Sequence, residues 1–169
     1  VHLATLAGIA RALQRDAVAY VQARKRVFSH GSANLPKDDP LVQHIVGELA
    51  STAYVAQLAV ADVAAHLGAI ARARIAAHAQ GEEISKEALD ALELRTAQAQ
   101  VAIAEPVLRA ATRIFDVGGS TALEESRRLD RHWRNARALA SHNPVTYKAR
   151  SVGDILLKAD RMSMANSLE

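Results

Sequence analysis

The chain has 169 residues, half of them hydrophobic, with 21 lysines and arginines against 18 aspartates and glutamates. This length suffices for one domain with a buried core. The sequence has no cysteine, which excludes disulfides and thiolate metal sites, and its net charge of +3 is too small to indicate nucleic-acid binding. No apolar run approaches the roughly 20 residues of a membrane span, and no basic-then-apolar leader precedes the first helix. We therefore expect a cytoplasmic protein without a membrane segment.

Helical periodicity dominates the first half of the chain. A first amphipathic helix is predicted from about Leu3 to Val27, and a polar loop follows it. Asp39 can cap a second helix, because Pro40 would occupy the first helical position, where its missing N–H costs nothing. That long helix is predicted to end near Gly81.

A third helix is predicted to begin at Ser85, which can serve as its N-cap. Pro106 is expected to kink this helix, because proline lacks the amide proton that the helical ladder needs. The pair Gly118-Gly119 is expected to end it.

Two more helices complete the predicted fold. Thr121 and Glu124 have the spacing of a capping box, which predicts the start of a fourth helix. Asn143-Pro144 breaks the chain and can start a short fifth helix through Leu157. Long helices with short connections predict one all-α domain over residues 1–169, an antiparallel four-helix bundle with a short fifth helix. The many alanines and few aromatic residues predict a thin core that needs a partner surface.

Metal binding is not expected. A di-iron bundle requires Glu-x-x-His pairs that project inward from two helices, and the sequence has no such pair. It also has no His-x-x-x-His pair. The pair that comes nearest to metal-ligand spacing is Asp62 with His66, which we interpret as an ordinary hydrogen bond.

The most informative segment is 129–148, a basic helix that runs into a His-Asn-Pro corner. Arg127, Arg131 and Arg134 recur at helical spacing and would form one cationic stripe. The stripe has two readings: a solvated face balanced by pairs such as Asp130–Arg134, or a phosphate clamp.

Three other features are each open to a structural and a functional reading. The basic run 24–26 could complement the C-terminus of the first helix. Gly118-Gly119 could be a helix C-cap or a place where the backbone approaches a nucleotide closely. His142 lies at a helix end, where a histidine is as often structural as functional.

Four segments together resemble the C-terminal helical domain of the acyl-CoA dehydrogenase superfamily. They are LAGIARALQRDAVAYVQARKRVF, DDPLVQHIVGELA, IFDVGGSTAL and LDRHWRNARALASHNPVTYK. The last segment looks like the flavin-dependent monooxygenase branch, the dibenzothiophene monooxygenase-like enzymes. Complete members place a helical domain and a β-domain before this bundle. The resemblance thus implies that the chain is a fragment that lacks both.

The resemblance also implies roles for particular residues. Arg24 and Arg26 match arginines that contact the flavin phosphate, often across a subunit interface, and the register leaves both open. Gly118-Gly119 matches glycines that let the backbone approach the flavin tail of a neighbouring subunit. His142 matches the histidine near the reactive face of the flavin, and Asn143 would help to fix that corner.

One departure from the family pattern favours oxygenation over dehydrogenation. Many acyl-CoA dehydrogenases carry a catalytic glutamate after a segment that corresponds to residues 134–137, and counting onward places Asn143 there. An amide cannot act as a general base. Other dehydrogenases place the base at the start of the first helix, where this chain has His2 and no acid before Asp16.

The implied function is that of the C-terminal domain of a two-component monooxygenase. A separate flavin reductase would supply reduced FMN or FAD, and O2 would oxygenate a small aromatic or sulfur-containing substrate. The assembly would be a homo-oligomer, a dimer or tetramer, and the isolated fragment would be inactive. Two alternatives remain open: an FAD-dependent acyl-CoA dehydrogenase, and a non-enzymatic helical assembly module. Nucleic-acid contact is not expected, because no helix-turn-helix signature appears.

Overall fold

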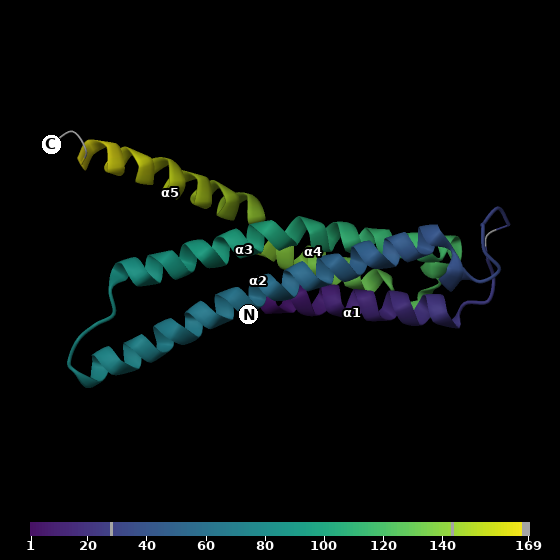
Figure 1. Cartoon of the computed structure of the whole chain (residues 1–169), viewed down its shortest axis with the longest axis horizontal. Helices are drawn as coiled ribbons and strands as arrows, with labels where there is room; N and C mark the ends of the chain where they lie inside the picture. Colours follow the sequence, from purple (N-terminus) through teal and green to yellow (C-terminus); the bar gives the residue numbers. More distant parts are fainter. Residues whose placement is uncertain (28, 143, 167–169) are drawn as a thin grey trace.

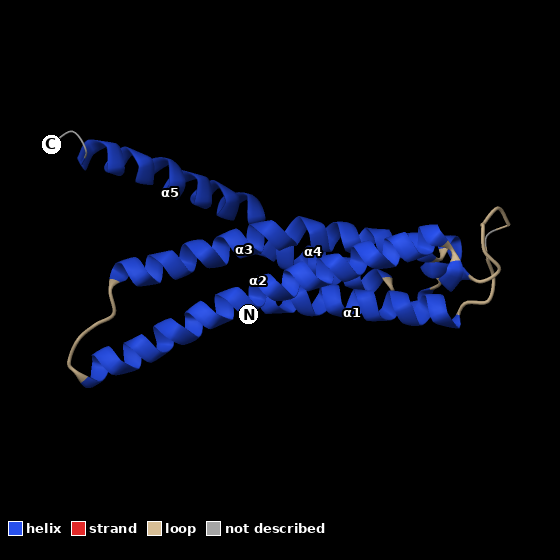
Figure 2. Ribbon diagram, viewed as in Figure 1, coloured by secondary structure: helices blue, strands red, loops and turns tan. Residues whose placement is uncertain are grey.

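The computed structural model describes residues 1–27, 29–142 and 144–166, with side chains up to Lys158. These residues form helices and connecting turns, and no strand occurs among them, which confirms the all-α prediction (Figure 2). The α-helices are α1 (His2–Ala23), α2 (Pro40–Ala79), α3 (Lys86–Arg113), α4 (Asp130–His142) and α5 (Val145–Asn166). Four short 3-10 helices are η1 (Pro36–Asp38), η2 (Ile114–Val117), η3 (Gly119–Leu123) and η4 (Glu125–Arg127).

Helices α1 to α4 alternate in direction and lie side by side as a bundle (Figure 1). The centre of the bundle is a close-packed core whose largest fully buried side chains are aliphatic. They are Leu6, Leu13, Leu49, Ile103, Val107, Ile114 and Val117. Helix α5 leaves the bundle after its first turns, and most of its contacts are with α3. With 22 residues it is longer than the short helix that the sequence predicted.

The first turns of α2 and α3 confirm their predicted caps. The carboxylate of Asp39 accepts a hydrogen bond from the Leu41 amide at 2.9 Å, and Pro40 occupies the first helical position. The Ser85 hydroxyl accepts one from the Ala88 amide at 3.3 Å. Each cap satisfies an amide that would otherwise lack an intrahelical partner.

The predicted start of the fourth helix at Thr121 is wrong. Residues 114–127 form successive 3-10 turns instead, and α4 begins at Asp130. The reason is that both capping side chains are engaged elsewhere. The Thr121 hydroxyl donates to the Gly118 carbonyl at 2.9 Å, and the Glu124 carboxylate pairs with Arg127 at 3.0 Å. Arg128, with φ of 52°, then redirects the backbone into α4.

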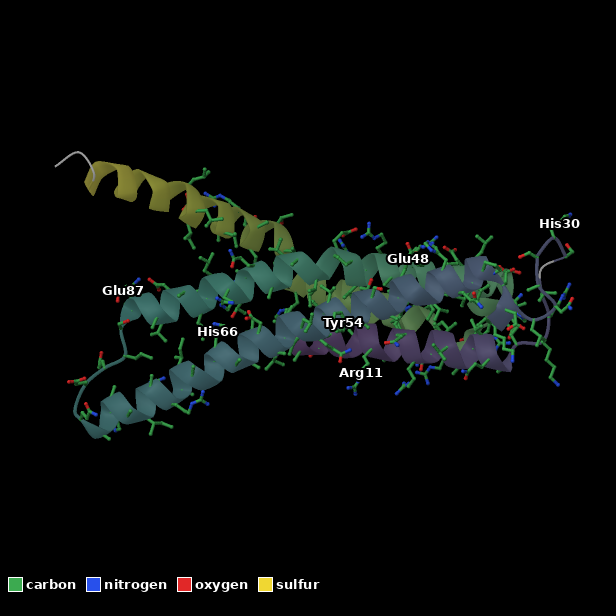
Figure 3. The ribbon with its side chains drawn as sticks, viewed as in Figure 1. Arg11, His30, Glu48, Tyr54, His66 and Glu87 are labelled. Carbon is green, nitrogen blue, oxygen red and sulfur yellow. The ribbon has the colours of Figure 1, made fainter. Side chains whose placement is uncertain are left out.

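The bundle has one region with a buried core and one region without buried residues. We call the part around the core the base, and residues 57–96, the distal ends of α2 and α3, the arm (Figures 1 and 3). No residue of the arm is buried. Several of its apolar side chains are exposed, namely Leu58, Leu67, Ile75 and Leu89. The arm therefore presents apolar surface that the described part of the chain does not cover.

Helix α2 is long and apolar enough to cross a membrane by length and composition alone. An 18-residue window within it has a mean hydropathy of 1.4 and is 11% buried. This differs from the sequence expectation, which counted uninterrupted apolar runs. Asp62 of this helix forms an ion pair with Arg95 of α3, with 2.9 Å between Oδ2 and Nη1. Both side chains are partly exposed, which is typical of a water-facing helix pair.

Candidate functional site

The structure separates the predicted site residues into two groups at opposite ends of α1. Arg24, Arg26 and the turn Gly118-Gly119 lie at its C-terminal end, and His142 lies at its N-terminal end. Helix α1 has 22 residues, so the two groups are about 33 Å apart at about 1.5 Å per residue. Asn143 lies outside the described residues. No single small ligand can contact both groups of one chain.

The two glycines of the turn are required for different reasons. A Cβ on Gly118 would lie 2.3 Å from Tyr20 Cε1 and 2.4 Å from the Tyr20 hydroxyl oxygen. Gly119 has a φ of +56°, in the left-handed region that favours glycine. Close approach was one of the two readings of the glycine pair, and within this chain the group that approaches Gly118 is the buried ring of Tyr20.

Tyr20 organises the turn through hydrogen bonds. Its hydroxyl lies 2.8 Å from Thr121 Oγ1, which in turn donates to the Gly118 carbonyl. Because the threonine hydroxyl has one proton, Tyr20 must be the donor to Thr121. The Arg127 guanidinium lies 4.8 Å from the centroid of the Tyr20 ring, and its Nε donates to the Thr121 carbonyl at 3.0 Å. The turn is therefore fixed before any ligand binds.

Arg24 is fixed against the same turn. Helix α1 ends at Ala23, four residues earlier than predicted, and Arg24 Nη1 donates to the Val117 carbonyl at 3.2 Å. Arg24 and Gly118-Gly119 line one cavity of about 470 Å³. His30, in the loop beyond α1 (Figure 3), lines the same cavity.

A neighbouring cavity of about 390 Å³ contains both candidate arginines. It is lined by Arg24, Lys25, Arg26 and Arg127, with Glu124 as its only acid. Arg24 lines both cavities, whereas Arg26 is exposed and lines only this one. Guanidinium groups next to a glycine turn fit a phosphate, since they donate charge-assisted hydrogen bonds where the backbone leaves room. The residues present therefore fit the phosphate end of a flavin.

The predicted cationic stripe on the basic helix does not form. Arg127 lies in η4, outside α4. Arg131 turns inward and binds the carboxylate of Asp16 on α1, while Arg134 pairs on the surface with Asp130 at 3.0 Å. Only Arg127 reaches the glycine turn, so a clamp made by all three arginines is excluded.

Sequence reasoning missed a polar cluster between α1 and α4. His132 is 3% exposed, and its Nε2 lies 3.0 Å from Asp16 Oδ2. Arg15 Nε donates to the other carboxylate oxygen at 3.1 Å, and Arg131 binds the same carboxylate. The signal was present, because Asp16 is the only acid in α1, but its meaning depends on the pairing of α1 with α4.

The half-buried Asp16 and the buried His132 of this cluster have shifted pKa values. Burial alone would raise the pKa of the Asp16 carboxyl, but hydrogen bonds from His132 and Arg15 and the charge of Arg131 outweigh it and lower the pKa. Burial lowers the pKa of His132 against the opposing hydrogen bond to Asp16. At neutral pH, Asp16 is thus a carboxylate and His132 a neutral imidazole, whose protonated Nε2 donates a hydrogen bond to the carboxylate.

His142 lies on the surface at the end of α4, where its ring contacts the ring of His2. The two centroids are 5.0 Å apart, and the planes meet edge to face at 76°. No group of three or more possible metal ligands occurs in the described part of the chain. The Asp62–His66 pair contains the expected hydrogen bond, between His66 Nδ1 and the Asp62 carbonyl at 2.8 Å.

Comparison with known proteins identifies the family. Residues 1–147 match the family model described as acyl-CoA dehydrogenase, C-terminal domain. A probable FMNH2-dependent monooxygenase, SfnC of Pseudomonas putida, is 30% identical over 95% of this chain. Dibenzothiophene monooxygenase of Mycolicibacterium goodii is 28% identical over 89% of the chain. The chain spans 39% and 34% of the lengths of these two relatives.

Solved structures agree with the sequence relatives. Methanesulfinate monooxygenase MsuC of Pseudomonas fluorescens superposes with a TM-score of 0.79 at 32% identity, over 91% of this chain and 38% of that one. FMN-bound TdsC of Paenibacillus sp. A11-2 gives a TM-score of 0.76 at 27% identity, over 91% of this chain and 37% of that one. The chain belongs to the family of acyl-CoA dehydrogenase C-terminal domains.

Proposed function

We propose that this chain is the C-terminal bundle of a longer flavin-dependent monooxygenase that uses reduced FMN and O2. The observation that carries the proposal is the corner formed by Arg24 and Gly118-Gly119, where a fixed guanidinium lies beside a glycine turn. The choice of FMN follows the relatives, among them an FMNH2-dependent monooxygenase and an FMN-bound structure. A separate flavin reductase would supply the reduced cofactor in the cytoplasm.

The substrate is a small aromatic or sulfur-containing molecule. Relatives of this chain are named for dibenzothiophene and for methanesulfinate, and one related structure holds FMN together with indole. When bound, FMN would supply the chemistry that activates oxygen. The upstream domains would close the site and exclude water from it.

Each flavin site combines two copies of the chain. The phosphate corner and His142 of one chain are about 33 Å apart along α1, too far for one FMN to bridge. Arg24 and Arg26 of one copy would therefore bind the phosphate of a flavin whose reactive edge faces His142 of a second copy. His142 would donate a hydrogen bond there, and Asn143 would fix the corner. The protein is thus a homo-oligomer, a dimer or tetramer, and the isolated bundle is inactive.

Flavin binding tests this proposal directly. In the longer protein, Arg24→Gln should raise the Kd for FMN about 10- to 100-fold, because a charge-assisted hydrogen bond contributes about 1.5–3 kcal/mol. Quenching of FMN fluorescence measures the affinity. Arg11→Gln is the matched control, since Arg11 is exposed on the same helix and points away from the bundle (Figure 3). Equal FMN affinity in the Arg24 variant and the wild type would overturn the assignment.

A further inference from the structure

A second histidine lies beside His142. His2 is the first residue of α1, and its half-buried ring meets the exposed ring of His142 edge to face, with centroids 5.0 Å apart. The contact joins the beginning of α1 to the end of α4. It therefore brings together two imidazoles that are 140 positions apart in the sequence.

The nitrogens of both rings are available to a ligand. The side chains of His2 and His142 make no hydrogen bond in the described part of the chain. His66 and His132 differ, because His66 binds a backbone carbonyl and His132 binds a carboxylate. A neutral imidazole offers one N–H donor and one nitrogen acceptor. The pair therefore presents up to four unused nitrogen positions at one end of the bundle.

His2 is better anchored than His142. It lies next to Leu3, which is buried in the core, and its helical turn is closed by the Thr5 hydroxyl, which donates to the Val1 carbonyl at 3.2 Å. His142 ends a helix, and its exposed side chain has several rotamers open to it. An edge-to-face ring contact contributes about 0.5–1.5 kcal/mol, enough to favour one of those rotamers.

We propose that His2 is a positioning residue of the oxygenation site, which rests on the proposed function of the chain. Its ring fixes the plane of the His142 imidazole, so that the hydrogen-bonding nitrogen of His142 faces the reactive edge of the flavin. A catalytic hydrogen bond tolerates errors of only about 0.5 Å and 10–20°, so such support has a measurable effect. The contact between the rings carries this role.

Two substitutions separate the ring from its nitrogens. His2→Ala removes the ring, whereas His2→Phe keeps an aromatic edge and removes the nitrogens. In the longer protein, His2→Ala should lower the yield of product per reduced flavin oxidised about 2- to 10-fold, the equivalent of the ring contact. The Kd for FMN should stay unchanged, and His2→Phe should restore the yield. His78→Ala, at an exposed site in the arm, is the matched control.

A second readout does not depend on activity. In the 169-residue chain itself, NMR should show cross-relaxation between ring protons of His2 and His142, and His2→Ala should broaden or shift the His142 ring signals. His78→Ala should leave them in place.

The outcomes distinguish the inference from the proposed function. If His142→Ala impairs oxygenation and His2→Ala does not, the role of His2 is overturned and the proposed function stands. If His2→Phe is as poor as His2→Ala, positioning by the ring is also overturned. If His142→Ala oxygenates as fast as wild type, the role proposed for His142 fails, and the inference fails with it.

Discussion

The base and the arm contain parts of the same two helices and are stabilised in different ways. In the base, α2 contributes Leu49 and Ala53 to a core where both are at most 1% exposed. After Ala56 the same helix has no buried residue. Helix continuity in the arm therefore depends on local propensity, which alanine favours, whereas helix continuity in the base depends on packing.

The arm also has apolar surface that the described part of the chain leaves exposed. The arm exposes the apolar side chains of Leu58, Leu67, Ile75 and Leu89, while the predicted phosphate corner lies at the opposite end of the bundle. The base can thus hold its site residues in place alone. The arm, which has no buried residue, is the part whose stability we expect to change most if another surface covers it.

Truncation of a core leucine should separate the two regions most strongly. Leu13→Ala in the base should lower the free energy of unfolding by about 2–5 kcal/mol, because it removes a fully buried side chain and leaves a cavity. Leu67→Ala in the arm should change it by no more than about 0.5 kcal/mol. Urea denaturation followed by circular dichroism measures both. Similar losses at the two sites would contradict the division into base and arm.

Gly118→Ala should have the next largest effect. Its Cβ would meet the Tyr20 ring at 2.3 Å, and that ring is held by Thr121, so the backbone must move. We expect a loss of about 1–3 kcal/mol and weaker FMN binding in the longer protein. Gly47→Ala is the control, since nothing lies within 4 Å of its added Cβ and alanine favours the helix. An unchanged unfolding midpoint in the Gly118 variant would show that the turn accommodates the added methyl group without loss of stability.

Acidification should weaken the base through the α1–α4 cluster. The pKa of His132 is lowered in the folded chain, so the unfolded chain binds the proton first once the pH falls below about 6.5, the ordinary value. Stability then falls until folded His132 is protonated too. The Asp16 contribution is complete above its ordinary pKa of 3.8 and is lost as the pH falls through the lower folded value.

His132→Gln sharpens this prediction. It keeps a side-chain donor for Asp16 but does not titrate, so the decline of the melting temperature just below pH 6.5 should become shallower than in wild type. His78→Gln, in the arm, should retain the wild-type slope. An unaltered slope in His132→Gln would mean that another group causes the acid sensitivity.

The smallest effect is expected for the ion pair of the arm. Asp62 and Arg95 are both partly exposed, and such pairs contribute about 0–1 kcal/mol. Asp62→Asn should therefore shift the melting temperature only slightly, and high salt should abolish the difference from wild type. A large shift would mean that the arm is more cooperative with the base than its exposure indicates.

Local signals predicted the helices well. Asp39-Pro40 and Ser85 mark their helix starts because the capping hydrogen bond lies within three residues of the cap. The predicted cap at Thr121 was wrong because its hydroxyl interacts with Tyr20, which lies 101 positions away in the sequence. A local pattern cannot reveal a competing partner that only the fold brings near.

The candidate site was predictable only in part. The Arg24 and Gly118-Gly119 corner followed from resemblance, and the structure brings these residues together in one cavity. Their distance from His142 could not be read from the sequence, because it depends on which ends of α1 and α4 meet. The Asp16–His132 pair was missed for the same reason.

The length of helix α1 fixes a distance within the molecule. It carries Arg24 just beyond one end and His2 at the other, so its 22 residues set the spacing between the two groups of predicted site residues. One inserted residue would advance that spacing by about 1.5 Å and rotate one end against the other by about 100°. Length variation among natural relatives should therefore be absent from this helix and confined to the loops and the arm, and surveys of insertions can measure this directly.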